Sequence, residues 1–109
     1  MSAQEKFEQL LKEKYQEIID VAHSHGAFNL QVFGSVARGE AREDSDLDLL
    51  FDFDSEKRSP WFPMGLKFDL EDLLGVSVDL GTAKSLKNRI RDEVLAEAKP
   101  LSDYEQKRI

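Results

Sequence analysis

Hydrophobic and acidic residues alternate along the middle of the chain, from Asp46 to Asp54. If this stretch is extended, its leucines and phenylalanines lie on one face and its aspartates on the other, and only Leu50 breaks the alternation. A period of two is typical of a β-strand with one buried face. We therefore expect a half-buried strand at about residues 47–53.

Two further short strands follow from the same reasoning. Apolar residues alternate with polar or small ones over residues 76–81, and the polar face of this segment carries one acid, Asp79. A short apolar run at residues 30–33 leads directly into Gly34. The pattern thus predicts a small sheet of three strands.

The longest helical pattern covers about residues 3–25. One face of this segment is apolar at spacings of three and four and consists of Phe7, Leu11, Tyr15, Ile18 and Ala22. Gly26 is the expected end of the helix. His23 and His25 lie near that end, where the helix dipole favours a cation, and we interpret them as solvated side chains rather than metal ligands.

Three more helices complete the pattern. A short one should begin after Gly34, a second ends at Gly75, and a third is capped by Thr82 and ended by Pro100. The order is helix, strand, helix, strand, helix, strand, helix. It predicts one α/β (α+β) domain over residues 1–109, in which a mixed three-stranded sheet has helices largely on one face and the acids on the other.

Two segments lie outside these elements. The loop at about residues 54–66 contains Trp61 and Phe62, which either pack down on the domain or form a lid or docking patch. The polar tail, at about residues 102–109, is expected to be flexible or bound to a partner.

Composition narrows the class of protein. The 109 residues are enough for one small domain, and 40% hydrophobic with 34% charged residues is typical of a soluble globular chain. The absence of cysteine excludes disulfides and thiolate metal sites. We see no signal-peptide core and no membrane-spanning run, so we expect a cytoplasmic protein. The net charge of −7 argues against a nucleic-acid binder and suits a metal–nucleotide substrate or a basic protein partner.

The aspartates suggest a metal site. Asp46 and Asp48 point to the same side of the predicted strand, with Cα atoms about 6.5–7 Å apart. With about 5 Å between the charges and an effective dielectric of about 20, their repulsion costs about 3 kcal/mol, which a divalent cation such as Mg²⁺ relieves. Asp79 supplies a third carboxylate from a neighbouring strand, so two metal ions could stabilise a phosphoryl displacement. For Asp52 and Asp54 we prefer a solvated acidic face.

The turn at Gly34 and Ser35 fits the same chemistry. Gly34 allows a tight turn and a close approach of the backbone to a ligand. If a helix begins near Ser35, its free N–H groups and dipole form an anion site, and Arg38 adds positive charge. We infer a phosphate-holding loop beside a metal-holding strand, and therefore an enzyme that handles nucleotides.

Together these residues resemble the signature of the DNA polymerase β-type nucleotidyltransferases. The segment that carries the resemblance is Gly34-Ser35-x-x-Arg38-Gly39 followed by Ser45-Asp46-x-Asp48-Leu49. The short chain is similar to the minimal nucleotidyltransferases, which are the antitoxin partners of HEPN ribonuclease toxins. The resemblance implies the polymerase β-like fold and two sets of site residues. The catalytic metal ligands would be Asp46, Asp48 and Asp79. The nucleotide-binding residues would be Gly34, Ser35, Arg38 and Ser45.

The resemblance also implies a reaction and a partner. ATP would be the substrate, two Mg²⁺ ions the cofactors, and AMP would be transferred to a hydroxyl, a tyrosine of a cognate HEPN-type toxin. Three other functions stay open: an antitoxin that merely binds, a small-molecule transferase of the antibiotic-modifying kind, and a nucleic-acid tailing enzyme. The intact set of three carboxylates argues against an antitoxin that merely binds. The lack of room for a second domain argues against a small-molecule transferase, and the net charge argues against a nucleic-acid tailing enzyme.

Overall fold

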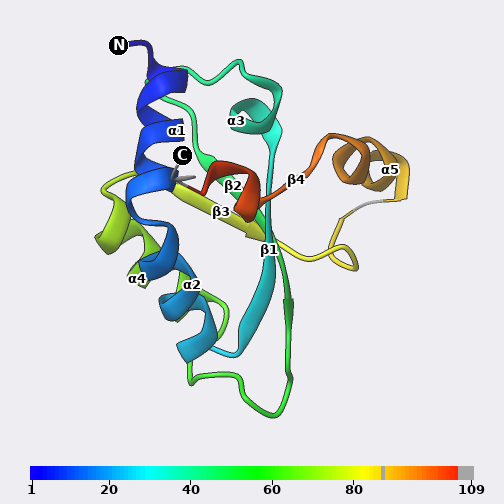
Figure 1. Cartoon of the computed structure of the whole chain (residues 1–109). Helices are drawn as coiled ribbons and strands as arrows, with labels where there is room; N and C mark the ends of the chain where they lie inside the picture. The colour runs from blue at the N-terminus through cyan, green and yellow to red at the C-terminus, as the bar shows by residue number, and fades with distance from the viewer. Residues whose placement is uncertain (87, 106–109) are drawn as a thin grey trace.

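A mixed sheet of four strands forms the centre of the molecule in the computed structural model, which describes residues 1–86 and 88–105 (Figure 1). The strands are β1 (Ala27–Phe33), β2 (Leu47–Phe53), β3 (Val78–Gly81) and β4 (Lys99–Pro100). Their order across the sheet is β3-β2-β1-β4. β1 is antiparallel to both β2 and β4, whereas β2 and β3 are parallel.

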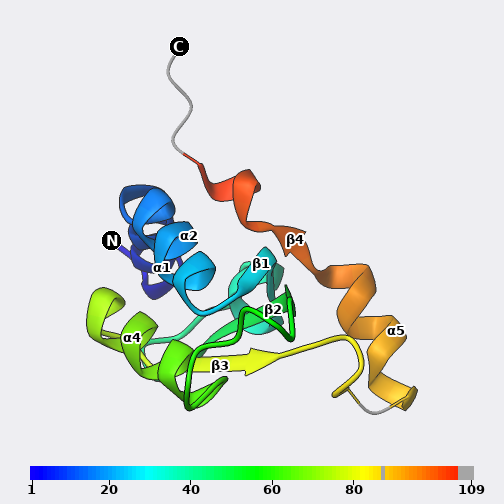
Figure 2. The ribbon, with the colours of Figure 1, turned by 90° about the horizontal axis from the view of Figure 1, so that it is seen from below.

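Most of the helices cover one face of this sheet, as the sequence predicted. α1 (Ala3–Glu13), α2 (Tyr15–Ser24) and α4 (Met64–Leu74) lie on the same side, and α5 (Asn88–Glu97) lies on the opposite side of the molecule (Figures 1 and 2). The short α3 (Gly34–Arg38) follows β1 directly. The mixed α/β architecture is therefore confirmed, while the number of strands is corrected from three to four.

The first helix is not continuous, contrary to the prediction for residues 3–25. It breaks at Lys14, whose backbone leaves the helical region with φ −103° and ψ 11°. Hydrogen bonds of the helical kind continue on both sides, from Lys14 N–H to Leu10 and from Ile18 N–H to Lys14. The break is thus a kink, and the apolar face stays continuous across it because Leu11 and Ile18 are both fully buried.

The last helix begins later than the prediction placed it. Thr82 does not cap α5. Instead, its hydroxyl accepts a hydrogen bond from the Ser85 N–H (3.1 Å), while the Ser85 hydroxyl accepts one from the Thr82 N–H (2.9 Å). This exchange closes a separate turn before α5. Pro100 does not end the helix either, because α5 stops at Glu97. Pro100 belongs to strand β4, where it pairs with Gln31 of β1.

The core lies between the sheet and the helices α1, α2 and α4. Its fully buried side chains include Leu11, Ile18, Val32, Val36, Leu47, Leu49, Leu66, Leu70 and Val78. Two further core residues come from the end of the described chain. Leu101 directly precedes the tail expected to be flexible or bound to a partner, and Tyr104 lies within it. Leu101 and Tyr104, at the two ends of the 3-10 helix η1 (Leu101–Tyr104), are buried. Residues 106–109 lie outside the described part of the chain.

The end of α2 differs from the prediction of two solvated histidines. His23 is exposed, but His25 is buried. One ring nitrogen of His25 bonds to the Ser59 hydroxyl, and Nε2 lies 2.7 Å from a carboxylate oxygen of Asp69. His25 therefore joins the end of α2 to the loop before α4 and to α4 itself.

The two aromatic residues of that loop have different environments. The Phe62 ring packs edge-on against Phe51, with ring centroids 5.7 Å apart, and also contacts Phe53. Trp61 is 80% exposed. One ring thus packs down on the domain, and the other remains available for a partner.

In the part of the chain that the structure describes, no helix is both long enough and apolar enough to cross a membrane.

Candidate active site

The three aspartates singled out from the sequence lie around the parallel pair β2–β3. The register of this pair places Asp48 directly beside Asp79, and Asp46 immediately precedes β2. Asp46 and Asp79 are exposed, and Asp48 is half-buried. The parallel pairing therefore brings the acids of the two alternating segments together on one part of the sheet.

The pKa of Asp48 is raised by its burial and by its position among these acids. Burial, and then the charges of Asp79 and Asp46, raise the pKa of Asp48 from 3.8 to about 6, and Arg38 partly opposes the shift. Nearby like charges disfavour ionisation, so the carboxylates of Asp46 and Asp79 both act on Asp48. A bound cation would reverse this balance.

Gly34 lies against Asp48. Its φ of +72° belongs to the left-handed region, and a Cβ built on it would be 2.0 Å from a carboxylate oxygen of Asp48. No side chain fits in that space without displacing the aspartate. The turn predicted to hold phosphate and the strand predicted to hold metal are thus in direct contact, because Phe33, the residue before Gly34, pairs with Asp48 across β1 and β2.

A fourth acid, which the sequence analysis missed, enters from α5. The backbone N–H of Gly34 donates to Oε1 of Glu97 (3.0 Å), and the Arg38 guanidinium donates to both carboxylate oxygens of Glu97 (3.2 and 3.3 Å). Glu97 also raises the pKa of Asp48. Glu97 is 63 residues from Gly34 along the chain, and no spacing or motif in the sequence links the two.

Arg38 is shared between two acids. Besides Glu97, its Nε donates to Glu40 at 3.2 Å. The hydrogen bond to Glu97 is the main reason that the pKa of Arg38 is raised, followed by the hydrogen bond to Glu40. Arg38 is exposed, at the last position of α3. The sequence predicts that it adds positive charge at the phosphate-holding turn, whereas in this structure its guanidinium is bonded to Glu97 and Glu40.

The two serines of the signature have different environments. Ser35 is half-buried in the first turn of α3. Ser45 is farther along the connection, where its hydroxyl accepts a hydrogen bond from the Arg42 N–H (2.8 Å) and closes the turn that leads into β2. In this structure Ser45 therefore shapes the approach to Asp46.

The donor set suits magnesium, although the side chains are not drawn together around an ion. Among residues 1–86 and 88–105, no three acidic or histidine side chains form a ready-made metal cluster. The acids near Asp48 offer only oxygen ligands, which Mg²⁺ prefers. Burial and then the repulsion from Asp79 and Asp46 raise the pKa of Asp48, and a cation would relieve that repulsion.

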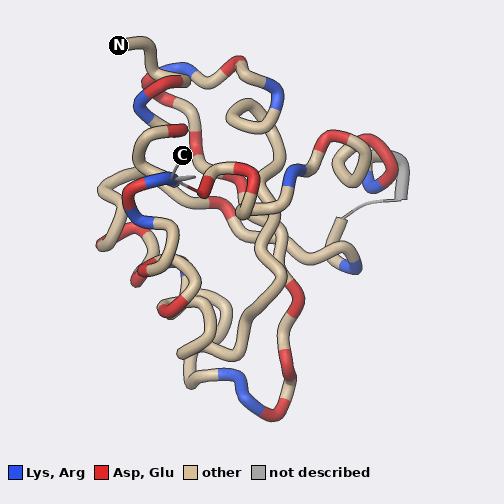
Figure 3. The backbone as a smooth tube through the Cα atoms, in the orientation of Figure 1, with Lys and Arg blue, Asp and Glu red and all other residues tan. Residues whose placement is uncertain are grey.

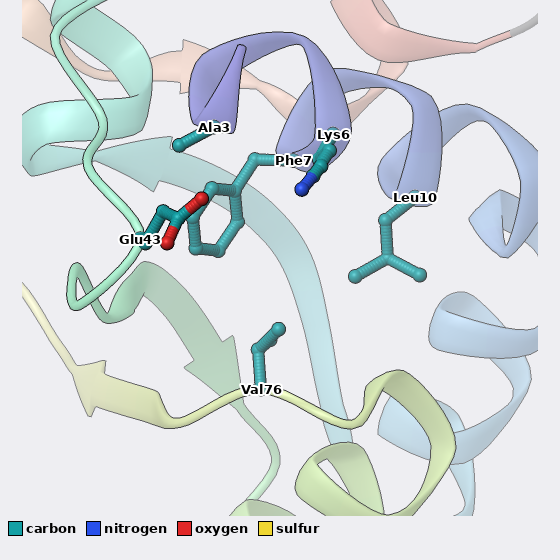
Figure 4. Close-up of a pocket in the computed structure, with 6 residues that line it drawn as sticks. All are labelled: Ala3, Lys6, Phe7, Leu10, Glu43 and Val76. Atoms are coloured by element: carbon teal, nitrogen blue, oxygen red, sulfur yellow. The ribbon is translucent and has the colours of Figure 1, made fainter. Parts of the chain in front are cut away.

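A hollow of about 260 Å³ lies elsewhere, between α1 and the segment that leads into β3 (Figure 4). It is lined mainly by apolar side chains, among them Phe7, Leu10 and Val76, and by none of the three aspartates. Figure 3 shows lysines and arginines scattered along the described chain. Asp46 and Asp79 themselves lie on an open surface.

Known proteins share this fold and these sequence features. The family model described as "Nucleotidyltransferase domain" matches residues 4–101. A protein named as a putative protein adenylyltransferase in Methanocaldococcus jannaschii is 38% identical over 88 residues, covering 81% of this chain and 94% of the relative. The protein adenylyltransferase MntA of Thermococcus cleftensis is 47% identical over 77 residues, covering 66% of this chain and 72% of the relative.

Solved structures agree. One described as a putative minimal nucleotidyltransferase is 46% identical, with a TM-score of 0.73, and the match covers 85% of this chain and 94% of that one. A crystal structure of a toxin–antitoxin with AMP-PNP, 22% identical, shares the fold with a TM-score of 0.64 over 79% of this chain and 70% of that one. The chain therefore belongs to the nucleotidyltransferase domain family. Within that family it is an enzyme of the minimal nucleotidyltransferase type.

Proposed function

We propose that this enzyme transfers AMP from ATP, in the presence of Mg²⁺, to a hydroxyl of a protein, a tyrosine of a HEPN-type toxin, and so acts as the antitoxin of the pair. The observation that carries the proposal is the position of Asp48, which touches the Gly34 turn on one side and pairs with Asp79 on the other. A nucleotide phosphate bound at the turn would lie next to the acids.

The acids are assigned to the metal. Asp46, Asp48 and Asp79 would hold Mg²⁺, with two ions as the expected number. When bound, Mg²⁺ supplies positive charge that stabilises the attacking and leaving oxygens of a phosphoryl transfer.

The remaining residues bind and orient the substrates. The Gly34 N–H, Ser35 and Arg38 hold the triphosphate. The acceptor hydroxyl oxygen forms a bond to the α-phosphorus while the bond to the β-phosphate oxygen breaks, and pyrophosphate leaves toward Ser35. We assign to Asp79 the proton of the acceptor hydroxyl, an assignment supported by its exposed position on β3, the edge strand.

A protein acceptor suits the open position of the acids. Because Asp46 and Asp79 are exposed, the chain alone does not enclose a small acceptor, whereas a protein acceptor brings its own surroundings. Two relatives are named as protein adenylyltransferases, and a structure with the same fold is a toxin–antitoxin. The net charge of −7 favours a basic partner. AMP on a ribonuclease would add negative charge where RNA phosphate binds and so disable the toxin.

The test mixes a HEPN-type toxin with the enzyme, ATP and Mg²⁺ and then measures the mass of the toxin by mass spectrometry. The expected result is a mass increase of one or more AMP groups on a tyrosine, with release of pyrophosphate. Asp48→Asn, in which the carboxylate is replaced by an amide of the same shape, should abolish both signals.

The other functions give different results in the same experiment. A toxin that stays unmodified but inhibited would support an antitoxin that acts by binding alone. Pyrophosphate released without AMP on the protein, in the presence of a small hydroxyl compound, would support a small-molecule transferase.

A further inference from the structure

Glu97 occupies hydrogen-bond donors that a bound triphosphate would need. Its Oε1 accepts from the Gly34 N–H at 3.0 Å, and both of its oxygens accept from the Arg38 guanidinium. These two groups are the phosphate-binding donors of the function proposed above. A backbone N–H has one hydrogen to donate, so it cannot serve the Glu97 carboxylate and a phosphate oxygen together at full strength.

Charge reinforces this competition. A carboxylate on the Gly34 turn is a negative charge at the place where a polyanion would enter, and like charges at close range repel. Glu97 also acts electrostatically on Asp48, so its carboxylate belongs to the same acidic region as the predicted metal ligands. Its position therefore works against the nucleotide in two ways: it occupies the donors and it repels the phosphates.

Glu97 can leave without unfolding the molecule. It is the last residue of α5, and 24% of its side chain is exposed to solvent. Glutamate has three rotatable side-chain bonds, so a rotamer change moves the carboxylate into water while α5 stays where it is. The backbone that follows is held independently, because Lys99 and Pro100 pair with β1.

We propose that Glu97 acts as an internal substitute for the nucleotide phosphates, holding Gly34 and Arg38 in the resting enzyme and withdrawing when a triphosphate binds. This proposal rests on the proposed function. It assigns to α5 the control of nucleotide affinity at the same site.

The test compares Glu97→Gln with the wild type by calorimetric titration with ATP and Mg²⁺, and with inorganic tripolyphosphate. Glutamine keeps the shape of the side chain but carries no charge and accepts weaker hydrogen bonds. We expect both probes to bind Glu97→Gln about tenfold more tightly, a factor that corresponds to about 1.4 kcal/mol. If Glu97 merely supported the turn, its replacement would instead weaken the binding of both probes.

Two control variants separate the Gly34 contact from simple loss of charge. Glu40 also binds Arg38 but has no hydrogen bond to Gly34, so Glu40→Gln removes the same charge from the same arginine. Asp92 is an exposed acid on α5, away from the side of the helix that bears Glu97. Glu40→Gln and Asp92→Asn are expected to change affinity less than about twofold.

A second readout needs no nucleotide. The amide proton of Gly34, followed by NMR, should move upfield in Glu97→Gln and stay in place in Glu40→Gln, because only the first variant loses the charged acceptor. Addition of tripolyphosphate to the wild type should shift the same signal.

The outcomes distinguish this inference from the proposed function. If the wild type binds ATP and Glu97→Gln binds it equally or more weakly, the competition is refuted and the nucleotide site stands. If neither binds ATP although the Gly34 signal reports release of its N–H, both the nucleotide site and the inference fail.

Discussion

Gly34 and Asp48 lie so close together that glycine is the only residue the position accepts. Two separate effects act against a side chain there: the left-handed φ of +72° and the 2.0 Å approach of a Cβ to the Asp48 carboxylate. The first effect strains the backbone, and the second moves a predicted metal ligand.

Gly34→Ala is therefore expected to lower the free energy of unfolding by about 2–4 kcal/mol and to abolish ATP binding. Gly39→Ala is the matched control, because Gly39 has φ +77° but nothing within 4 Å of the added Cβ. It should cost only about 1 kcal/mol, from backbone strain alone. Urea denaturation of both variants measures the difference. Equal losses would mean that the contact with Asp48 does not contribute.

The raised pKa of Asp48 makes stability depend on pH. Because the folded pKa of about 6 exceeds the ordinary value of 3.8, the folded protein binds this proton more tightly than the unfolded chain does. The resulting stabilisation is complete below about pH 4 and is lost as the pH rises through 6. At neutral pH, without metal, the ionised Asp48 thus destabilises the fold.

Asp48→Asn removes this penalty and should be more stable than the wild type at pH 8 by about 1–2 kcal/mol, after allowance for solvent screening at a half-exposed group. The advantage should vanish at pH 4. Denaturation curves across this range, without Mg²⁺, test the prediction. Asp52→Asn, on the exposed end of β2, is the control and should leave stability nearly unchanged at any pH. A wild type as stable as Asp48→Asn at pH 8 would show that the ionised Asp48 does not destabilise the fold.

At the scale of whole elements, α2, α4 and the loop between β2 and α4 are joined through His25. Its ring bonds to Ser59 of the loop and to Asp69 of α4, and Gly65 leaves room for it, since a Cβ there would be 3.3 Å from the ring. A buried polar side chain with two partners costs more to remove than an exposed one.

His25→Ala is expected to destabilise the protein by about 2–3 kcal/mol and to speed amide hydrogen exchange in residues 54–63. His23→Ala removes an exposed histidine from the same helix end and should change neither quantity measurably. Unchanged exchange in His25→Ala would show that other contacts hold the loop.

The alternating strands and the periodic helices could be predicted because each pattern is local. Residues 47–53 and the acid at Asp79 follow from a period of two, and the parallel pairing of β2 and β3 then brings the acids together. β4 could not be predicted, because two residues are too short to show alternation. The kink at Lys14 interrupts neither the apolar face nor the helical spacing, so it could not be predicted from the hydrophobic pattern.

In the candidate site, too, the residues of local motifs could be predicted and those that depend on distant contacts could not. Gly34, Arg38, Asp46 and Asp48 stand in one short motif, Asp79 follows from the alternation of a second strand, and the structure brings these residues together. Glu97 and the burial of His25 depend on contacts between distant segments, and the sequence carries no local signal for either. Tertiary packing also decided the outcome for Trp61 and Phe62, which are adjacent in sequence but differ in exposure.

At the scale of the whole molecule, Trp61 is the most exposed of the large apolar side chains that the structure describes. Met64 and Phe68 of α4, nearby in sequence, are also exposed in part. Large exposed aromatic residues are frequent anchors in protein interfaces. We expect Trp61→Ala to change stability by less than about 0.5 kcal/mol and to weaken a complex with the proposed toxin partner by about tenfold or more.

Phe62→Ala gives the contrasting result. Because the Phe62 ring packs on Phe51 and Phe53, its loss should cost about 2–3 kcal/mol of stability. Denaturation and calorimetric binding of the two variants separate the roles of the two rings. A complex that tolerates Trp61→Ala would place the interface elsewhere.

The contact between α1 and η1 has a consequence for synthesis of the protein. Phe7 and Leu11 share one core cluster with Leu101 and Tyr104, which the ribosome adds last among the core residues. Until those two emerge, part of the first helix has no apolar partner, and β1 lacks its neighbour β4. The core therefore closes only after residue 104 has left the ribosome, and until then the nascent chain presents uncovered apolar surface to chaperones.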